Sequence, residues 1–462
     1  MSFRKRSLIL LCAVLILSVL AACSGGGGGN TGAQEPQPTA QPSQQPSATA
    51  APQEPASEPA PQKDPVTIQF WHIYSDGEIK ALMDELIAEF EAKYPYITVD
   101  QLGVSFWDYW TKLTTAVAGG SGPDLALNEI GNVGARAGTG TLVNLDKYIQ
   151  RDNYDLSQLF PVLVEQSKWE GSFYQMPFES DVRLLYYNKA AFREAGLDPE
   201  KPPQNWDEWA EYAEKLTKMN GGLIDRIGFS PALGNMYMWT LAWTNGGDFW
   251  DDDLNPTFTK PENVEALKWM ADVQAKYGQR AFSAFQSQAG SLGYSPFIAE
   301  KVAMIVDNNT LYGDILRYNP DLEFGVAPIP YQVSPASWSA GFSLEIIDNK
   351  DEARADAAWE LMKFLLDKDT QIRLHEMTRG LYSNMNAVGD PKFMQDPVWK
   401  TMIDIMEFTR FREYVPGSPA WANHIQPQVE AVLLGEMTPE AALQKAQELV
   451  ETELKNYAAT QQ

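Results

Sequence analysis

Apolar residues near the start of the folded chain alternate between strand-like and helix-like spacing. Residues 66–71 read VTIQFW, a β-branched and aromatic run that predicts a short strand. From Ile79 to Phe90 apolar residues recur at helical spacing, which predicts an amphipathic helix stopped by Pro95. Further elements are expected at 97–102 (strand), 107–118 (helix) and 124–127 (strand). This alternation predicts an α/β domain with a largely parallel sheet, in which ligands bind beyond the carboxyl ends of the strands.

The rest of the chain continues in the same manner. Asn205 and Thr438 have the side chains expected at helix N-caps, and Pro439 suits the first turn of a last helix. Another helix is expected at about 353–366. Short apolar runs predict strands at 184–187, 302–306, 324–327 and 342–347.

Residues 1–22 have the pattern of a lipoprotein signal peptide. A positive segment with Arg4 is followed by an apolar run too short to be a good membrane span, and small residues then precede Cys23. Small residues before a cysteine are typical of the bacterial lipobox. We therefore expect cleavage before Cys23 and attachment of lipid, palmitate included, to this residue. An ordinary secretion signal with an incidental cysteine is the alternative.

Residues 23–63 are expected to be the lipidated cysteine and a disordered tether. A five-glycine run is followed by Pro, Gln, Ala, Ser and Thr, with almost no large apolar side chains to bury. An anchor followed by a flexible spacer predicts an extracytoplasmic protein held by lipid at the outer face of the cell membrane.

Length and charge limit the folded part further. Residues 64–462 are too many for one ordinary core, so two domains are expected. The chain has 61 acidic and 36 basic residues and a formal net charge of −25. Such a surface repels nucleic acid and argues weakly against anionic solutes. We expect a monomer without a nucleic-acid partner.

Sequence motifs for catalysis and metal binding are mostly missing. The three histidines have no metal-ligand spacing, and the sequence has no Cys-x-x-Cys, P-loop or Gly-x-Ser-x-Gly motif. We therefore expect no metal, no cofactor and no enzymatic activity. A glycosidase-like carboxylate pair stays open, because 61 acidic residues make chance pairs common.

The aromatic content is the positive signal. The chain has 14 Trp, 19 Tyr and 20 Phe, and several tryptophans lie in polar, loop-like surroundings. Sugars pack their flat C–H faces on aromatic rings, and their hydroxyl groups need carboxylate and amide partners. Trp243, close to Asn245 and Asp248, is one example. A core position is the alternative for each tryptophan, but the set favours a carbohydrate site.

Residues 174–196, YQMPFESDVRLLYYNKAAFREAG, resemble the signature of family 1 extracellular solute-binding proteins of ABC sugar importers. The resemblance spans residues 66–455 and includes GPDL at 122–125, LVNL at 142–145, WSAGFS at 338–343 and TRGLY at 378–382. It implies a type II periplasmic-binding-protein fold, with two α/β lobes, hinge strands between them and an interlobe cleft.

Similarity to maltose-binding protein, a member of that family, implies how the chain is divided. Lobe 1 is expected to contain residues 64–177 and 307–343, and lobe 2 residues 178–306 and 344–462. Crossings between the lobes are expected near 176–179, 304–307 and 342–346.

The resemblance also implies the ligand contacts. Trp239 and Trp421 are expected to stack on a sugar ring, whereas Met236 replaces an aromatic residue of maltose binders and argues against maltose itself. The expected substrate-binding residues are Tyr74, Glu129, Glu179, Asp181, Trp239, Trp243, Asp248, Asp307, Trp338, Gly341, Arg379 and Trp421.

These observations predict a lipoprotein that captures a sugar or oligosaccharide in its cleft and delivers it to the permease subunits of an ABC transporter. Three alternatives stay open. The chain could bind another solute such as a polyol, a sugar phosphate or a peptide. It could be a secreted carbohydrate-active enzyme, or an adhesin or sensor that serves a signalling receptor.

Overall fold

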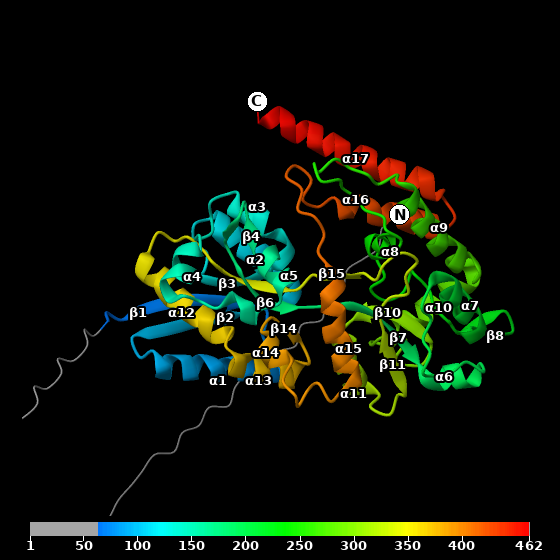
Figure 1. Cartoon of the computed structure of the whole chain (residues 1–462), viewed down its shortest axis with the longest axis horizontal. Helices are drawn as coiled ribbons and strands as arrows, with labels where there is room; N and C mark the ends of the chain where they lie inside the picture. The colour runs from blue at the N-terminus through cyan, green and yellow to red at the C-terminus, as the bar shows by residue number, and fades with distance from the viewer. Residues whose placement is uncertain (1–62, 462) are drawn as a thin grey trace, which may run out of the picture. The chain divides into compact units, whose positions relative to one another are not determined.

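The computed structural model describes residues 63–461 of the 462-residue chain (Figure 1). The expected signal peptide, the expected lipidation site Cys23 and almost all of the expected tether lie outside the described residues. Within residues 63–461, no helix combines the length and the apolar character needed to span a membrane.

A six-stranded sheet forms the centre of lobe 1, in the order β14-β6-β13-β3-β1-β2. The first three strands of the chain pair in parallel, as the sequence predicts, whereas the other three add antiparallel neighbours. Glu129 ends β3, at the edge where the carboxyl ends of the parallel strands meet. The strands are β1 (Val66–His72), β2 (Ile97–Gly103), β3 (Leu125–Glu129), β6 (Met176–Ser180), β13 (Phe342–Ile346) and β14 (Leu381–Tyr382).

Helices pack against this sheet through the apolar faces that their sequences predict. Helix α1 (Gly77–Lys93) buries Leu82, Met83, Leu86, Ile87 and Phe90, which confirms the helical periodicity. Helix α12 (Glu352–Leu365) contacts β1, and α13 (Lys368–Thr378) contacts α1 (Figure 1). Helices α2 (Phe106–Ala118) and α3 (Val133–Ala137) follow β2 and β3 in the chain.

Lobe 2 contains a three-stranded antiparallel sheet and a cluster of aromatic residues. Its sheet has the order β10-β7-β11. The strands are β7 (Arg183–Asn188), β10 (Met304–Asn308) and β11 (Phe324–Ala327). Four helices contact one another in this lobe: α8 (Met238–Thr244), α9 (Pro261–Ala275), α16 (Ala422–Leu433) and α17 (Pro439–Thr460). Their buried side chains include several large rings, among them Trp239, Trp243, Phe249 and Trp421.

The chain passes between the two sheets at three places. It leaves β6 and enters β7 across residues 181–182, close to the first expected crossing. It returns across residues 339–341, between β12 (Ser337–Trp338) and β13, just before the expected 342–346 crossing. The third passage follows β14 through α15 (Pro397–Ile405) to β15 (Thr409–Arg410), which pairs with β12. The crossing expected near 304–307 is wrong, because β10 and the following β11 both pair with β7.

The expected lobe boundaries need correction in two segments. Residues 307–327 stay with lobe 2, since β11 extends the sheet of β7. Residues 344–382 belong to lobe 1, because β13 inserts between β3 and β6 and α12 covers β1. Neither partnership is visible in local sequence, since each joins strands that lie far apart in the chain.

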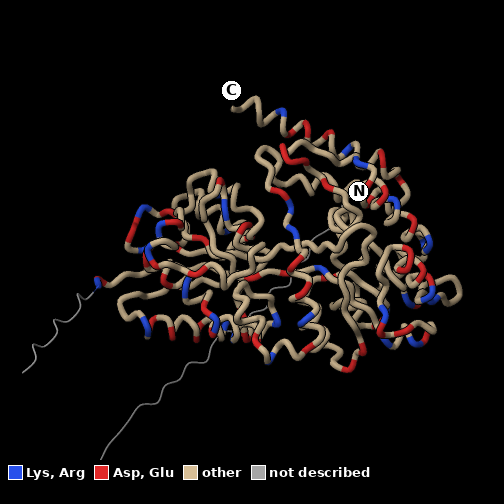
Figure 2. The backbone as a smooth tube through the Cα atoms, in the orientation of Figure 1, with Lys and Arg blue, Asp and Glu red and all other residues tan. Residues whose placement is uncertain are grey.

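Acidic residues are spread over both lobes (Figure 2). Many of them pair with neighbouring lysines or arginines at the surface, for example Lys80 with Asp84 at 2.6 Å and Arg193 with Glu323 at 2.7 Å. Exposed pairs of this kind contribute little to stability. The excess negative charge is therefore a property of the whole surface.

Candidate functional site

A cavity of about 120 Å³ lies between the two lobes. Lobe 1 contributes Glu129 and Asn132, which lie just beyond the carboxyl end of β3, where α/β sheets bind ligands. Lobe 2 contributes Trp421, the N-cap residue just before α16. The rest of the lining comes from Gly131, from the segment around the second passage and from the segment after β15; these residues are Gly131, Trp338, Ser339, Ala340, Gly341, Phe411, Arg412, Glu413, Tyr414 and Pro419.

Aromatic rings form one wall of this cavity. Trp338 and Trp421 line it directly, and Trp239 lies behind them with ring centroids 5.2 Å from Trp338 and 6.3 Å from Trp421. Tyr237 stacks on Trp239 at 4.6 Å. All three tryptophans are buried, and Trp421 is only 1% exposed. The three tryptophans thus form a connected cluster, in which Trp239 is a supporting ring and not part of the cavity lining.

Arg412 covers part of this aromatic wall. Its Cζ atom lies 5.0 Å from the ring centre of Trp239 and 5.1 Å from that of Trp338. Burial lowers the pKa of the Arg412 guanidinium, while the negative charge of Glu129 acts in the opposite direction. The distances are those of cation–π contacts, which hold the guanidinium without using its N–H groups.

Trp243 and Asp248, two expected ligand contacts, support the segment that carries Arg412. Arg410 donates from Nη2 to both carboxylate oxygens of Asp248 at 3.0 Å, and its Cζ lies 4.6 Å from the ring centre of Trp243. The Nε1 of Trp421 donates to the backbone oxygen of Glu413 at 2.9 Å. These contacts fix both ends of the segment before Trp421, and neither Trp243 nor Asp248 is among the cavity-lining residues.

Asp181 connects the passage at residues 181–182 with the passage at residues 339–341. Its Oδ1 accepts from the backbone N–H of Ala340 at 2.6 Å and pairs with Arg183 at 2.5 Å. The Cζ of Arg183 lies 3.9 Å from the ring centre of Trp338. Asp181 Oδ1 is therefore occupied within the protein, whereas Arg183 Nε is buried without a partner among the described residues.

Glu179 and Tyr74 face each other at the same junction. The hydroxyl of Tyr74 donates to Glu179 Oε2 at 3.5 Å, a long bond. Burial, and then the charge of Asp181, raise the pKa of Glu179 to about 7. Gly341 has φ of +75°, and a Cβ there would lie 2.4 Å from the Glu179 backbone oxygen, so this close approach requires glycine.

This pKa predicts a pH-dependent contribution to stability. Because the pKa of Glu179 is raised from 4.5 to about 7, the folded state binds this proton more tightly than the unfolded state. The contribution is fully present below pH 4.5 and is lost as pH rises through about 7. Chemical denaturation should show that the free energy of unfolding of the wild type, relative to that of the Glu179→Gln variant, falls across this range. A difference that is constant or rises with pH would contradict the assignment.

Asp307 and Arg379 are not among the residues that line the cavity. Asp307 accepts from the backbone N–H of Asn308 at 2.9 Å and from the side chain of Asn235, and burial raises its pKa. Arg379 is the C-cap residue after α13, in the left-handed region with φ of 56°, and its backbone N–H donates to the backbone oxygen of His375 at 2.8 Å. Of the expected contacts, the cavity brings together Glu129, Trp338, Gly341 and Trp421. Contact with a ligand stays a prediction for every expected site residue.

Sequence reasoning missed Asn132, Arg412, Glu413 and Tyr414. The last three lie in the segment RFREY at 410–414, where charged and aromatic residues alternate without helical periodicity shortly before Trp421. Such a combination in an irregular segment is the signal that could have identified them.

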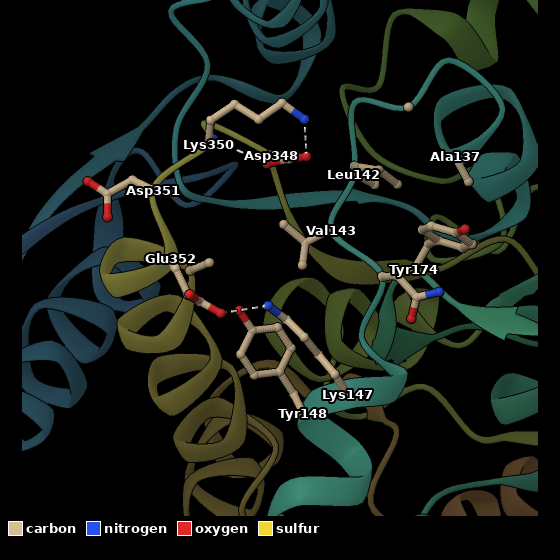
Figure 3. A pocket seen from close by; sticks show the side chains of 13 residues that line it. Ala137, Leu142, Val143, Lys147, Tyr148, Tyr174, Asp348, Lys350, Asp351 and Glu352 are labelled. Atoms are coloured by element: carbon tan, nitrogen blue, oxygen red, sulfur yellow. Dashed lines mark hydrogen bonds and ion pairs between the residues drawn. The ribbon is translucent and has the colours of Figure 1, made fainter.

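Another pocket, of about 510 Å³, lies on lobe 1 beside Tyr148 and Tyr174 (Figure 3). Its charged side chains pair with one another: Lys147 with Glu352 at 3.2 Å, and Lys350 with Asp348. No tryptophan lines it, which makes the interlobe cavity the better candidate. Among residues 63–461, no three His, Cys, Asp or Glu side chains gather so that they could hold a metal ion.

Two α/β lobes with an aromatic cavity between them define a two-lobed solute-binding protein. The chain belongs to the bacterial extracellular solute-binding protein family, whose sequence pattern matches residues 75–372, more than half of the chain. This finding confirms the resemblance and the fold expected from the sequence.

Individual relatives cover most of the chain. The sn-glycerol-3-phosphate-binding periplasmic protein of Escherichia coli (strain K12) is 26% identical over 425 residues, with 83% of this chain and 91% of the relative covered. A protein solved with mannotriose bound is 26% identical, with a TM-score of 0.73, and covers 83% of this chain and all of its own. An ABC transporter solute-binding protein of Thermotoga lettingae, solved with α-D-tagatose, is 28% identical, with a TM-score of 0.69 and coverage of 84% and 99%.

Proposed function

We propose that this protein captures a sugar or oligosaccharide in the interlobe cavity and delivers it to the permease of an ABC transporter. The observation that carries the proposal is the cavity lining, in which the rings of Trp338 and Trp421 lie beside Glu129, Asn132 and Arg412. Rings suit the C–H face of a sugar, and carboxylate, amide and guanidinium groups suit its hydroxyls. The relatives solved with mannotriose and α-D-tagatose support this ligand class.

Capture by lobe closure follows from where the cavity lies. Its walls come from both lobes, so a bound ligand contacts both only when they are close together. A ligand shifts the equilibrium toward the closed form by as much as it prefers that form. Docking of the closed form on the permease then couples capture to import.

The remaining parts of the proposal concern anchoring and chemistry. The expected lipid on Cys23 would hold a monomer at the outer face of the cell membrane, within reach of the permease. The protein would act by binding alone and not as an enzyme, which agrees with its membership in a family of binding proteins. Radiolabelled palmitate incorporation by the wild type, and not by a Cys23→Ser variant, tests the anchor.

A titration with a panel of mono- and oligosaccharides tests the ligand class. A binding saccharide is expected to change tryptophan fluorescence, because Trp338 and Trp421 line the cavity. It should also raise the melting temperature, since a ligand at 100 times its Kd stabilises the folded state by about 2.7 kcal/mol.

sn-Glycerol 3-phosphate is the comparison ligand in this titration. The E. coli relative supports capture of a polyol phosphate as the second candidate function. If sn-glycerol 3-phosphate changes the fluorescence or the melting temperature and no saccharide does, this second candidate replaces the proposal.

A further inference from the structure

Arg412 differs from the other arginines near the cavity, because its side chain has no ion-pair partner among residues 63–461. Arg136 pairs with Glu345, Arg183 with Asp181 and Arg410 with Asp248. Among residues 63–461, the side chain of Arg412 has no hydrogen bond and no ion pair, yet it lines the cavity. A guanidinium carries five N–H donors, and none of the Arg412 nitrogens is among the fully buried atoms without a partner, so these donors are open to the cavity. They are therefore available to a ligand.

The contacts of Arg412 position its guanidinium in the cavity wall. Trp239 and Trp338 hold the guanidinium at 5.0 and 5.1 Å from their ring centres. Cation–π contacts of this kind use the positive charge and leave the N–H groups available. The guanidinium is thus a fixed fork of donors, which needs little ordering when a ligand arrives.

We propose that Arg412 is a specificity-determining residue that donates paired hydrogen bonds to neighbouring hydroxyl groups of a neutral saccharide. This inference rests on the proposed function and names the ligand group that one side chain recognises. Glu413 provides a matching acceptor in the same lining, since its Oε2 is buried and has no partner among the described residues. A hydroxyl group both accepts and donates, so one sugar can satisfy Arg412 and Glu413 together.

The charges of the lining favour a neutral ligand over an anionic one. The charged residues of the cavity wall are Glu129, Arg412 and Glu413, two carboxylates and one guanidinium. A carboxylate or phosphate bound to Arg412 would share the cavity with these two acidic side chains, whose negative charges oppose binding of an anion. Hydroxyl groups form the same paired geometry without that repulsion.

Calorimetric titration of Arg412 variants tests the inference. The ligands are mannotriose, α-D-tagatose, sn-glycerol 3-phosphate and D-galacturonate. Arg412→Met keeps the unbranched apolar stem of the side chain and removes its donors, so saccharide affinity is expected to fall about 10- to 100-fold. Arg412→Lys keeps the charge without the planar fork, and it is expected to recover only a small part of this loss. Arg193→Met, at an exposed ion pair with Glu323, is the matched control and should bind like the wild type.

The outcomes separate this inference from the proposed function. If neither saccharide binds the wild type, the inference is overturned, and the wider saccharide panel decides the proposed function separately. If a saccharide binds the wild type and Arg412→Met equally well, the inference alone is overturned. Tighter binding of sn-glycerol 3-phosphate or D-galacturonate than of either saccharide would overturn the assignment to a neutral ligand. Thermal unfolding of each variant shows that a lost affinity does not reflect a lost fold.

Discussion

Replacing Trp421 with alanine is expected to lower the free energy of unfolding by about 3–5 kcal/mol. The indole is 1% exposed and packs against the rings of Phe249, Trp250 and Phe258 at centroid distances of 5.6, 5.9 and 5.7 Å. Its removal leaves a cavity among side chains that cannot collapse freely, and it deletes the hydrogen bond to Glu413. Urea denaturation monitored by circular dichroism measures the change.

Trp107→Ala is the control for this substitution. Trp107 is 84% exposed at the start of α2, so the same change in side chain is expected to alter stability by only about 0.5 kcal/mol. Similar losses for the two variants would show that Trp421 is not held in the packed cluster described above. If only Trp421→Ala loses much of its free energy of unfolding, the ligand affinity of this variant has to be measured at urea concentrations well below its denaturation midpoint.

The second large effect concerns the ion pair between Arg136 and Glu345. Glu345 is fully buried on β13, where it accepts from Arg136 and from Asn128 Nδ2 at 3.0 Å. Arg136→Met leaves this carboxylate without its counter-charge, and the expected cost is about 3–5 kcal/mol in the free energy of unfolding. Chemical denaturation of the variant and the wild type at the same ionic strength measures it.

A double variant shows whether the loss arises from the uncompensated charge. Arg136→Met combined with Glu345→Met removes both charges and is expected to recover most of the stability lost in the single variant. Lys147→Met, which breaks the exposed pair with Glu352, should cost no more than about 1 kcal/mol. A double variant less stable than Arg136→Met alone would contradict this explanation.

Local sequence was sufficient for most elements of lobe 1 because their signals are local. The spacing of Leu82, Leu86 and Phe90 predicts the buried face of α1, and the β-branched run at 66–71 predicts β1. Partnerships between strands were not predictable in the same way. Residues 304–307 do form a strand, but hydrophobicity alone does not reveal that it pairs with β7 and keeps the chain in lobe 2.

The candidate site was predictable in kind and only partly in detail. Trp338 and Trp421 line the cavity, and their contact with a ligand stays a prediction. Trp243 is buried and does not line the cavity; Arg410 lies over its ring and pairs with Asp248. Arg412 could not be assigned before the structure was known, because its role depends on two rings that come from distant parts of the chain.

The pairing of β12 with β15 has a mechanical consequence. Ser337 is paired with Thr409 and Trp338 with Arg410, so two of the three passages form a single ribbon. A rotation of one lobe relative to the other would carry Trp338 and the nearby Arg412 as one body. Trp338 and Arg412 would then keep their positions relative to each other as the lobes open and close. Only their distance to Glu129, on the other lobe, would change.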